Sequence, residues 1–434
     1  MNFLKSNNFF TLCAILFFGV FFFFFVNIFF THKYNPEKYL NSNLIEIAKQ
    51  KFIDKGYENI HFGLMPARYR TLIKAVNGYA SSKIYLVVKD KKSFKALNLA
   101  DDKGFYFFVI VLMNIFNLSL NKAIDVFFIF LFAGASISGM IGGMFLYKKW
   151  LLRMIYLSSL MFINFIAIRV GGLYVINALL VVAFFPWVLW LFERNKIDKI
   201  TFIVLSAIVF FISIAHFVRV YSGVGLLLFM LILLFYFVKS SLKKKCLLIF
   251  ILLMFGLLPV LFFNSLFSER DLFLRKNVAN YTKQTNIEGH YFWHNAYIGL
   301  GYLENPYVSA YKDEVGIAKI KSVDPNVIFA SMQHQKILKE AFFELIFKHP
   351  LFFMRNVFAK FGVILFYFLA SANIGLFFAY FYRKSKILEV SFLVALGFNA
   401  LFGILIVPYS TYLLGFIAFA TMYGMVSINY YLEQ

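Results

Sequence analysis

Apolar and polar stretches alternate along the whole chain, and the apolar stretches are long enough to cross a lipid bilayer. About ten of them follow one another, interrupted by two long polar segments, residues 32–104 and 267–348. A bilayer core of roughly 30 Å requires about 20 helical residues, each rising about 1.5 Å. Backbone groups inside lipid must be hydrogen-bonded within their own segment, so these stretches are predicted to be helices. The expected fold is therefore all-α: a polytopic transmembrane bundle of about ten spans with two extracytoplasmic α or α/β lobes.

Clusters of basic residues between the spans set the expected orientation, because such clusters stay on the cytoplasmic side. Clusters at 148–149, 193–196, 243–245 and 383–386 fit one path. In this path both polar segments lie outside and both termini are cytoplasmic. The predicted spans are residues 9–30, 124–147, 153–169, 172–192, 199–218, 220–238, 246–266, 361–382, 387–407 and 410–431.

Two apolar stretches near the start need separate interpretation. Residues 9–30 are predicted to be a retained anchor, because no small-residue cleavage site follows them. Residues 105–118 are too short to span comfortably and are predicted to form a helix on the outer surface. The expected domains are an anchor, a first outer loop with the surface helix, a bundle, a second outer lobe with interfacial helices, and C-terminal spans (1–31, 32–123, 124–266, 267–360 and 361–434).

The second polar segment contains two predicted helices. Asp324 followed by Pro325 is typical of a helix start, with an apolar face continuing to Leu345. His349 and Pro350 break that helix. Residues 351–360 are then predicted to form an interfacial helix that leads into the next span.

Composition excludes a soluble domain, since 61% of the residues are hydrophobic and 15% are charged. The net charge of +22 is explained by lysines at cytoplasmic span ends and on lobes that meet lipid head groups, so no nucleic-acid partner is expected. The two cysteines, Cys13 and Cys246, lie in or beside spans. Neither a disulfide framework nor a thiolate metal site is expected.

Asp101 and Asp102 directly precede the predicted surface helix. Aspartate often caps helices at this position, which is the simplest interpretation. A carboxylate there could also serve as the base that a sugar transfer to a hydroxyl requires.

Three basic residues, Arg169, His216 and Arg219, fall at the outer ends of predicted spans. Ionisable groups at membrane depth are costly and often functional, and together these could bind a lipid phosphate. The alternative is that the arginines reach to the head groups and His216 packs inside the bundle. Arg68 and Arg70, on either side of Tyr69, could bind an anionic substrate, although a solvated loop face is the simpler interpretation. Three glycines suggest close helix packing. These glycines are Gly139, Gly142 and Gly143.

His290, Trp293 and His294 form an aromatic block in the second polar segment. It suits either stacking on a sugar ring or structural packing. The two histidines are four residues apart, but Tyr291 follows His290 where the zincin pattern has Glu, so no metal site is predicted. Whether the reaction needs a divalent cation stays open.

The order of parts resembles the GT-C glycosyltransferases, polytopic enzymes that use lipid-linked sugar donors. The local match runs from Asp101-Asp102-Lys103-Gly104-Phe105-Tyr106 through residues 117–120 to the span at 124–147 and its Lys148-Lys149. It is most similar to bacterial proteins resembling dolichyl-phosphate-mannose-protein mannosyltransferases. Residues 293–301, with Asn305-Pro306-Tyr307 and Asp313, resemble a block in poorly characterised members of that group.

The resemblance implies transfer of a sugar from a polyprenyl-phosphate-linked donor to a lipid or glycan acceptor, on the outer face of a bacterial inner membrane. These enzymes usually carry a catalytic Asp shortly after the first span, but residues 31–53 contain none, and their first acid is Glu37. Glu37, Asp101 and Asp102 are therefore the catalytic candidates. The alternatives are an O-antigen or polysaccharide polymerase or ligase, for which Arg219 and His290 would matter more, and a lipid-linked glycan transporter.

Overall fold

Helices make up most of the chain that the computed structural model describes, namely residues 64, 66–90, 93–97, 101–237, 240–279, 281, 292–329, 331–382 and 385–433. Eight of the described helices are long and apolar enough to cross a membrane. These are α5 (Leu120–Leu146), α6 (Trp150–Val170), α7 (Val175–Arg194), α8 (Lys199–Val218), α10 (Leu242–Asn277), α14 (Pro350–Ala372), α16 (Lys386–Leu405) and α17 (Ser410–Glu433). The predicted all-α membrane bundle is confirmed for this part of the chain.

Two predicted spans are shorter or broken in the structure. Helix α9 (Val224–Phe237) has 14 residues, which corresponds to a length of only about 21 Å. The span predicted at 361–382 is divided at Asn373, whose φ of 36° and ψ of −126° are not helical, and it continues as α15 (Ile374–Phe381). The predicted interfacial helix at 351–360 is not separate, because α14 runs on from Pro350 without a break. The span predicted at 9–30 lies outside the described residues.

The bundle is built around α7 and α17, since 78% of the apolar window of each is buried, against 17–44% for the other six. Glycines allow the closest helix contacts. A Cβ on Gly139 would lie 2.3 Å from the carbonyl oxygen of Val182, and one on Gly143 would lie 2.2 Å from the Tyr156 ring. The prediction that these glycines mark close helix packing is confirmed.

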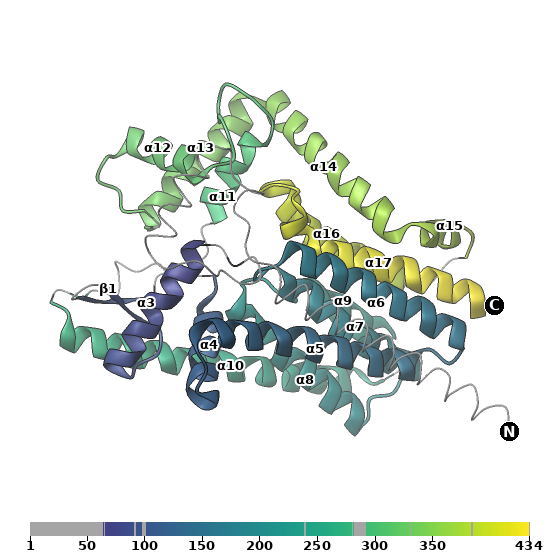
Figure 1. The fold of residues 1–434 in the computed structure, drawn as a ribbon. Coiled ribbons are helices and arrows are strands. Elements are labelled where there is room, and N and C mark those ends of the chain that lie inside the picture. The colour runs from purple at the N-terminus through teal and green to yellow at the C-terminus, as the bar shows by residue number, and fades with distance from the viewer. Residues whose placement is uncertain are drawn as a thin grey trace.

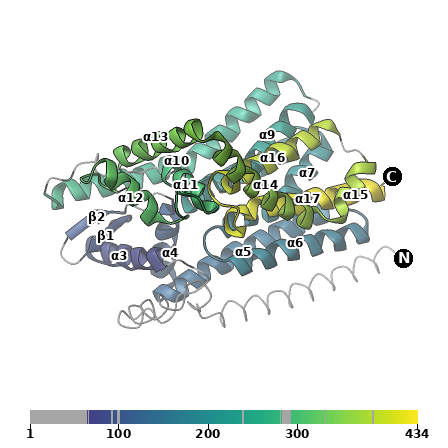
Figure 2. The ribbon, with the colours of Figure 1, turned by 90° about the horizontal axis from the view of Figure 1, so that it is seen from above.

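The described parts of both polar segments lie at the same end of the bundle (Figure 1), and the view from above agrees (Figure 2). The first part comprises α3 (Pro66–Ser82), an antiparallel hairpin of β1 (Val87–Asp90) and β2 (Ser93–Ala96), and α4 (Lys103–Phe116). The second comprises α11 (Phe292–Gly299), a short 3₁₀ turn (Leu300–Tyr302), α12 (Asp313–Val323) and α13 (Met332–Lys348).

Helix α10 extends beyond its predicted span of 246–266 and ends only at Asn277. Its last turns pack against the hairpin, where Phe273 meets the edge of Phe94 at 5.2 Å and Leu274 is buried together with Val87. The helix therefore continues past the end of the predicted span, because the residues after Ser268 still have an apolar face to bury.

The predicted helix start at Asp324 is also wrong. Asp324 ends α12, since its backbone N–H donates to Ile320, and α13 begins after Ser331. The Ser331 hydroxyl accepts a hydrogen bond from the N–H of His334 at 3.1 Å, which makes Ser331 the N-cap. The predicted apolar face is buried from Ile337 to Phe342, and the break at His349 is confirmed.

Candidate functional site

Two aspartates at the start of α4 form the centre of a buried ion-pair cluster. Asp102 occupies the N-cap position, but its side chain makes no capping hydrogen bond. Its Oδ2 pairs with Nε of Arg68, and its Oδ1 lies 3.1 Å from Nη1 of Arg219. Asp101 Oδ2 accepts from the same Nη1 at 3.2 Å. Helix capping therefore does not explain Asp102, and we refer to Arg68, Asp101, Asp102 and Arg219 as the arginine–aspartate cluster.

Arg219 is held in place by the tight connection between α8 and α9. The N–H of Val220 donates to the backbone carbonyl of Asp101 at 3.1 Å, which fixes this connection to the start of α4. The N–H of Tyr221, a residue at φ 66°, donates to Nδ1 of His216 at 3.2 Å. His216, predicted to bind phosphate, therefore has a positioning contact beside Arg219.

Arg68 joins the cluster from α3, and the expectation of a solvated face is wrong for it: its side chain is only 12% exposed. Burial would lower the pKa of Arg68, but the charges of Asp102 and the nearby tyrosines, together with the hydrogen bond to Asp102, outweigh burial and raise it. Arg68 therefore stays charged. Its neighbour Arg70 is exposed, as expected.

Two tyrosines complete the cluster. Tyr174, just before α7, lies below both arginines, with Cζ of Arg219 4.3 Å and Cζ of Arg68 5.5 Å from its ring centroid. Tyr106 on α4 is fully buried, and its hydroxyl has no hydrogen-bond partner among the described residues. Burial raises the pKa of Tyr106 well above its usual value, so it stays a neutral donor. A buried donor without a partner is unusual in a native protein.

An apolar groove of about 520 Å³ lies between α4, α5, α7 and α8. Its lining includes Phe108 on α4, the helix that Asp102 precedes, and Val218, the residue before Arg219. The remaining lining comes from α4, α5, α7 and α8: Val111, Leu112, Phe127, Phe130, Leu131, Gly134, Ala135, Ser138, Ile176, Leu179, Leu180, Ala183, Phe184, Phe211, Ile214 and Ala215. The volume lies within the range of about 300–1,000 Å³ that is typical of ligand pockets.

A second polar cluster joins α11, α12 and α13; its two histidines are buried and its aspartate is exposed. His294 Nδ1 is 3.0 Å from Nε2 of His334, and His294 Nε2 is 3.2 Å from Oδ1 of Asp313. We refer to these three residues as the histidine cluster. Burial and the neighbouring His294 lower the pKa of His334 to about 4, and the hydrogen bond from His294 lowers the pKa of Asp313.

Trp293, predicted as a sugar platform, packs within this lobe. Its ring contacts Phe342 and Phe343 at centroid distances of 5.9 and 5.4 Å, and Nζ of Lys339 lies 5.5 Å from it. These neighbours favour the packing interpretation over a sugar-stacking one.

A row of tyrosines connects the two clusters. Tyr412, at the start of α17, meets the ring of Tyr174 edge-on at 5.3 Å, and its hydroxyl lies 3.0 Å from the hydroxyl of Tyr311. Tyr311 precedes Asp313 of the histidine cluster by two residues. The sequence gives no local signal for this row, because its members lie far apart along the chain.

The other predicted site residues are not part of either cluster. Arg169 is exposed in the last turn of α6, and none of the polar contacts found within the described ranges includes it. Glu37 and His290 lie outside the described residues. No group of three or more His, Cys, Asp or Glu side chains within the described part of the chain is arranged to hold a metal ion.

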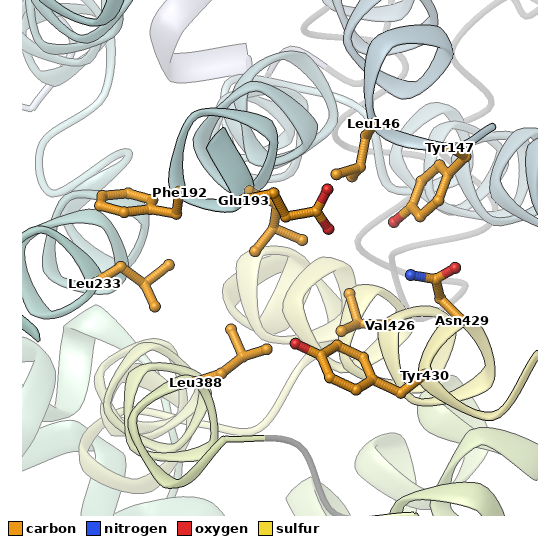
Figure 3. Close-up of a pocket in the computed structure, with 10 residues that line it drawn as sticks. Leu146, Tyr147, Phe192, Glu193, Leu233, Leu388, Val426, Asn429 and Tyr430 are labelled. Carbon is orange, nitrogen blue, oxygen red and sulfur yellow. The ribbon is translucent and has the colours of Figure 1, made fainter. Parts of the chain in front are cut away.

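A smaller cavity, of about 30 Å³, lies at the opposite end of the bundle. Figure 3 shows the carboxylate of Glu193 and the hydroxyl of Tyr147 turned towards its centre, above Tyr430. Its volume holds only one or two water molecules, at about 10–15 Å³ each. The large groove is therefore the better candidate for an organic ligand.

No protein-family model, curated protein or solved structure matches this chain. The candidate site therefore rests on its geometry: two arginines paired with aspartates, a buried tyrosine hydroxyl without a partner among the described residues, and an apolar groove that Val218 lines next to Arg219.

Proposed function

We propose that this protein is a membrane glycosyltransferase of the GT-C type, which moves a sugar from a polyprenyl-phosphate-linked donor to a lipid or glycan acceptor. The observation that carries the proposal is that Val218, which lines the 520 Å³ apolar groove, directly precedes Arg219 of the arginine–aspartate cluster. A polyprenyl phosphate combines an anionic head with a long apolar chain. The groove suits the chain, and Arg68 and Arg219 suit the phosphate.

The charge around the start of α4 favours an anionic ligand. Beside the cluster, the ring of Phe267 lies between Nζ of Lys103 at 4.6 Å and Cζ of Arg270 at 5.2 Å. Arg270 is paired with Asp271. Lys103 and Arg270 therefore add two cationic groups to Arg68 and Arg219 in this region. The arginines of the cluster would stabilise a departing lipid phosphate.

The distribution of basic connections supports a site at the outer face of a bacterial inner membrane. Lys148, Lys149, Arg194 and Lys243 all lie at the end of the bundle opposite the two clusters. The positive-inside rule assigns that end to the cytoplasm. The clusters would then face outwards, where acceptors of cell-envelope glycans are found.

The transfer assay that tests this proposal uses Gly134, which lines the groove on α5. A Cβ at Gly134 would meet no atom within 4 Å, so Gly134→Leu should fill the groove without strain. The matched control is Gly397→Leu on α16, where the space is equally open and which does not line this groove. We expect Gly134→Leu to lower transfer from a polyprenyl-phosphate-linked donor at least tenfold, and Gly397→Leu to leave it unchanged. Equal activity of both variants would refute the groove as the donor site.

The same assay tests the predicted carboxylates. Asp102→Asn should abolish transfer, because both oxygens of Asp102 hold arginines. Asp101→Asn and Glu37→Gln decide whether either residue acts in catalysis, as the GT-C resemblance implies. Unchanged transfer in all three variants would defeat the assignment of these residues.

One alternative uses the same geometry. A ligase or polymerase would place a pyrophosphate-linked glycan against Arg219, and transfer only from pyrophosphate-linked donors would favour it. A transporter would instead show counterflow of a labelled lipid-linked glycan through proteoliposomes without any transfer.

A further inference from the structure

The turn between α8 and α9, residues 219–223, carries Arg219, and each backbone N–H of this turn has a hydrogen-bond acceptor. At its start, the N–H of Val220 donates to the carbonyl of Asp101, as described above. At its end, the N–H of Gly223 donates to Oδ1 of Asn177 on α7 at 3.1 Å. The turn is therefore fixed at one end by the start of α4 and at the other by a side chain from the centre of the bundle.

Asn177 reaches the turn in a fixed orientation, because a second asparagine holds its amide nitrogen. Nδ2 of Asn177 donates to Oδ1 of Asn399 on α16 at 2.8 Å. Nδ2 of Asn399, which is only 1% exposed, donates in turn to the carbonyl of Ala395 at 2.8 Å. Three hydrogen bonds thus connect the backbone of α16 with Gly223, and we refer to Asn177 and Asn399 as the asparagine pair.

Glycines on two further helices leave room for the asparagine pair. A Cβ on Gly415 of α17 would lie 2.3 Å from Nδ2 of Asn177 and 2.4 Å from Oδ1 of Asn399. A Cβ on Gly225 of α9 would lie 2.2 Å from Nδ2 of Asn399. Asparagines often join helices inside membranes, and the bond between the two amides does that for α7 and α16. This role leaves the bond from Gly223 to Asn177 unexplained, because that bond holds the turn.

We propose that Asn177, oriented by Asn399, is a positioning residue for the proposed transfer: it holds the α8–α9 turn so that Arg219 meets the phosphate of the lipid-linked donor. This inference rests on the proposed function. A shift of the turn would move the Arg219 guanidinium relative to Asp101 and Asp102, which its Nη1 contacts at 3.2 and 3.1 Å. Charge-assisted hydrogen bonds need short and aligned contacts, so the position of the turn sets the strength of phosphate binding.

The test compares the affinities of the full-length protein in detergent for a polyprenyl phosphate and for the uncharged polyprenol of the same length. Asn177→Leu removes both amide hydrogen bonds at similar side-chain size. We expect it to weaken binding of the phosphate about tenfold, as when a hydrogen bond to a charged group is lost, and to leave polyprenol binding unchanged. The control is Asn164→Leu on α6, whose amide donates within its own helix, to Leu160 at 2.9 Å. It should change neither affinity.

A second variant disturbs the asparagine pair without replacing either member. Gly415→Ala places a methyl group against both amides, so they must move apart, and it should reproduce the selective loss of phosphate binding. Its control is Gly397→Ala on α16, where a Cβ meets nothing within 4 Å. Asn399→Leu should cost less affinity than Asn177→Leu, because the bond from Gly223 to Asn177 remains.

An Arg219→Lys background shows whether Asn177 acts through Arg219. If it does, Asn177→Leu should weaken phosphate binding by little more in that background, whereas independent effects would multiply. Independent effects, or an equal loss of phosphate and polyprenol binding, would overturn the inference. So would unchanged phosphate binding in Asn177→Leu and Gly415→Ala when Arg219→Lys weakens it, an outcome that leaves the proposed function standing. Absence of polyprenyl-phosphate binding by the wild type would refute both.

Discussion

The two polar clusters of this protein are built on different chemistry, although both lie at the same end of the bundle. The arginine–aspartate cluster joins segments far apart in sequence, Arg68 on α3, the aspartates before α4 and Arg219 after α8. The histidine cluster joins the three helices of one segment, α11, α12 and α13. The first holds the bundle and its attached elements together, whereas the second stabilises a single lobe.

Their responses to pH should differ for the same reason. Guanidinium groups stay charged at any pH that a protein tolerates, so the first cluster keeps its positive charge. In the second, two imidazoles face each other at 3.0 Å, an arrangement that requires one nitrogen to donate and the other to accept. If both rings were protonated, two N–H groups would face each other. The first cluster is thus suited to binding anions at constant strength, and the second is sensitive to acid.

The largest effect is expected for Arg219→Gln. The substitution removes the contact between Arg219 and Asp101 and leaves Asp102 with Arg68, inside a site where Arg219 is 12% exposed. Breaking a buried ion pair by removing one partner costs about 3–5 kcal/mol. We expect a large fall in the thermal midpoint of the detergent-solubilised protein and loss of polyprenyl-phosphate binding.

The control is Arg169→Gln, which removes an exposed arginine from the neighbouring end of α6. Surface substitutions of this kind change stability by less than about 0.5 kcal/mol. If both variants lost the same stability, the arginine–aspartate cluster would not be the structural centre described above.

Acidification should affect the histidine cluster next. The pKa of His334 is lowered from 6.5 to about 4 in the folded protein. Between these values the unfolded chain binds more protons than the folded one, so stability is complete above pH 6.5 and is lost as the pH falls towards 4. The lowered pKa of Asp313 adds a loss at still lower pH. We expect a loss of roughly 1–3 kcal/mol.

Hydrogen exchange can localise this loss. Peptides from α11–α13 should become less protected between pH 7 and pH 5, after correction for the intrinsic rate, while peptides from α3 and α4 should not. In His334→Gln the acid dependence of α11–α13 should flatten. Equal acid sensitivity in both regions would remove the distinction between the clusters.

The architecture of the bundle could be predicted because it follows from the length and hydropathy of the apolar stretches. Spans of apolar residues must be helical in lipid, and eight of the described helices satisfy that requirement. The helix boundaries outside the lipid were harder to predict from the sequence. Helix α10 continues to Asn277 because the hairpin buries its apolar face, and Asp324 ends a helix because Ser331 provides the cap of the next one.

The candidate site could be predicted only in part. Asp101, Asp102 and Arg219 were found because adjacent acids before a surface helix and an arginine at a span end are unusual locally. Arg68 was misassigned because its partner Asp102 is 34 residues away. Tyr174 is one of 26 tyrosines, and nothing near it in sequence reveals the two arginines above its ring. Contacts between distant segments depend on packing, which the sequence pattern does not show.

The smallest effect is expected for Gly316→Ala, which adds one methyl group against the histidine cluster. The new Cβ would lie 2.6 Å from Cε1 and 2.9 Å from Nδ1 of His294, so the imidazole must move away from His334. Overpacking of this kind costs about 1 kcal/mol or somewhat more. The matched control is Gly362→Ala, where a Cβ meets nothing within 4 Å and alanine favours the helix. Gly316→Ala should lower the protection of α11–α13 and leave α3, α4 and the transfer reaction unchanged. A variant that also lost transfer would show that the row of tyrosines couples the two clusters.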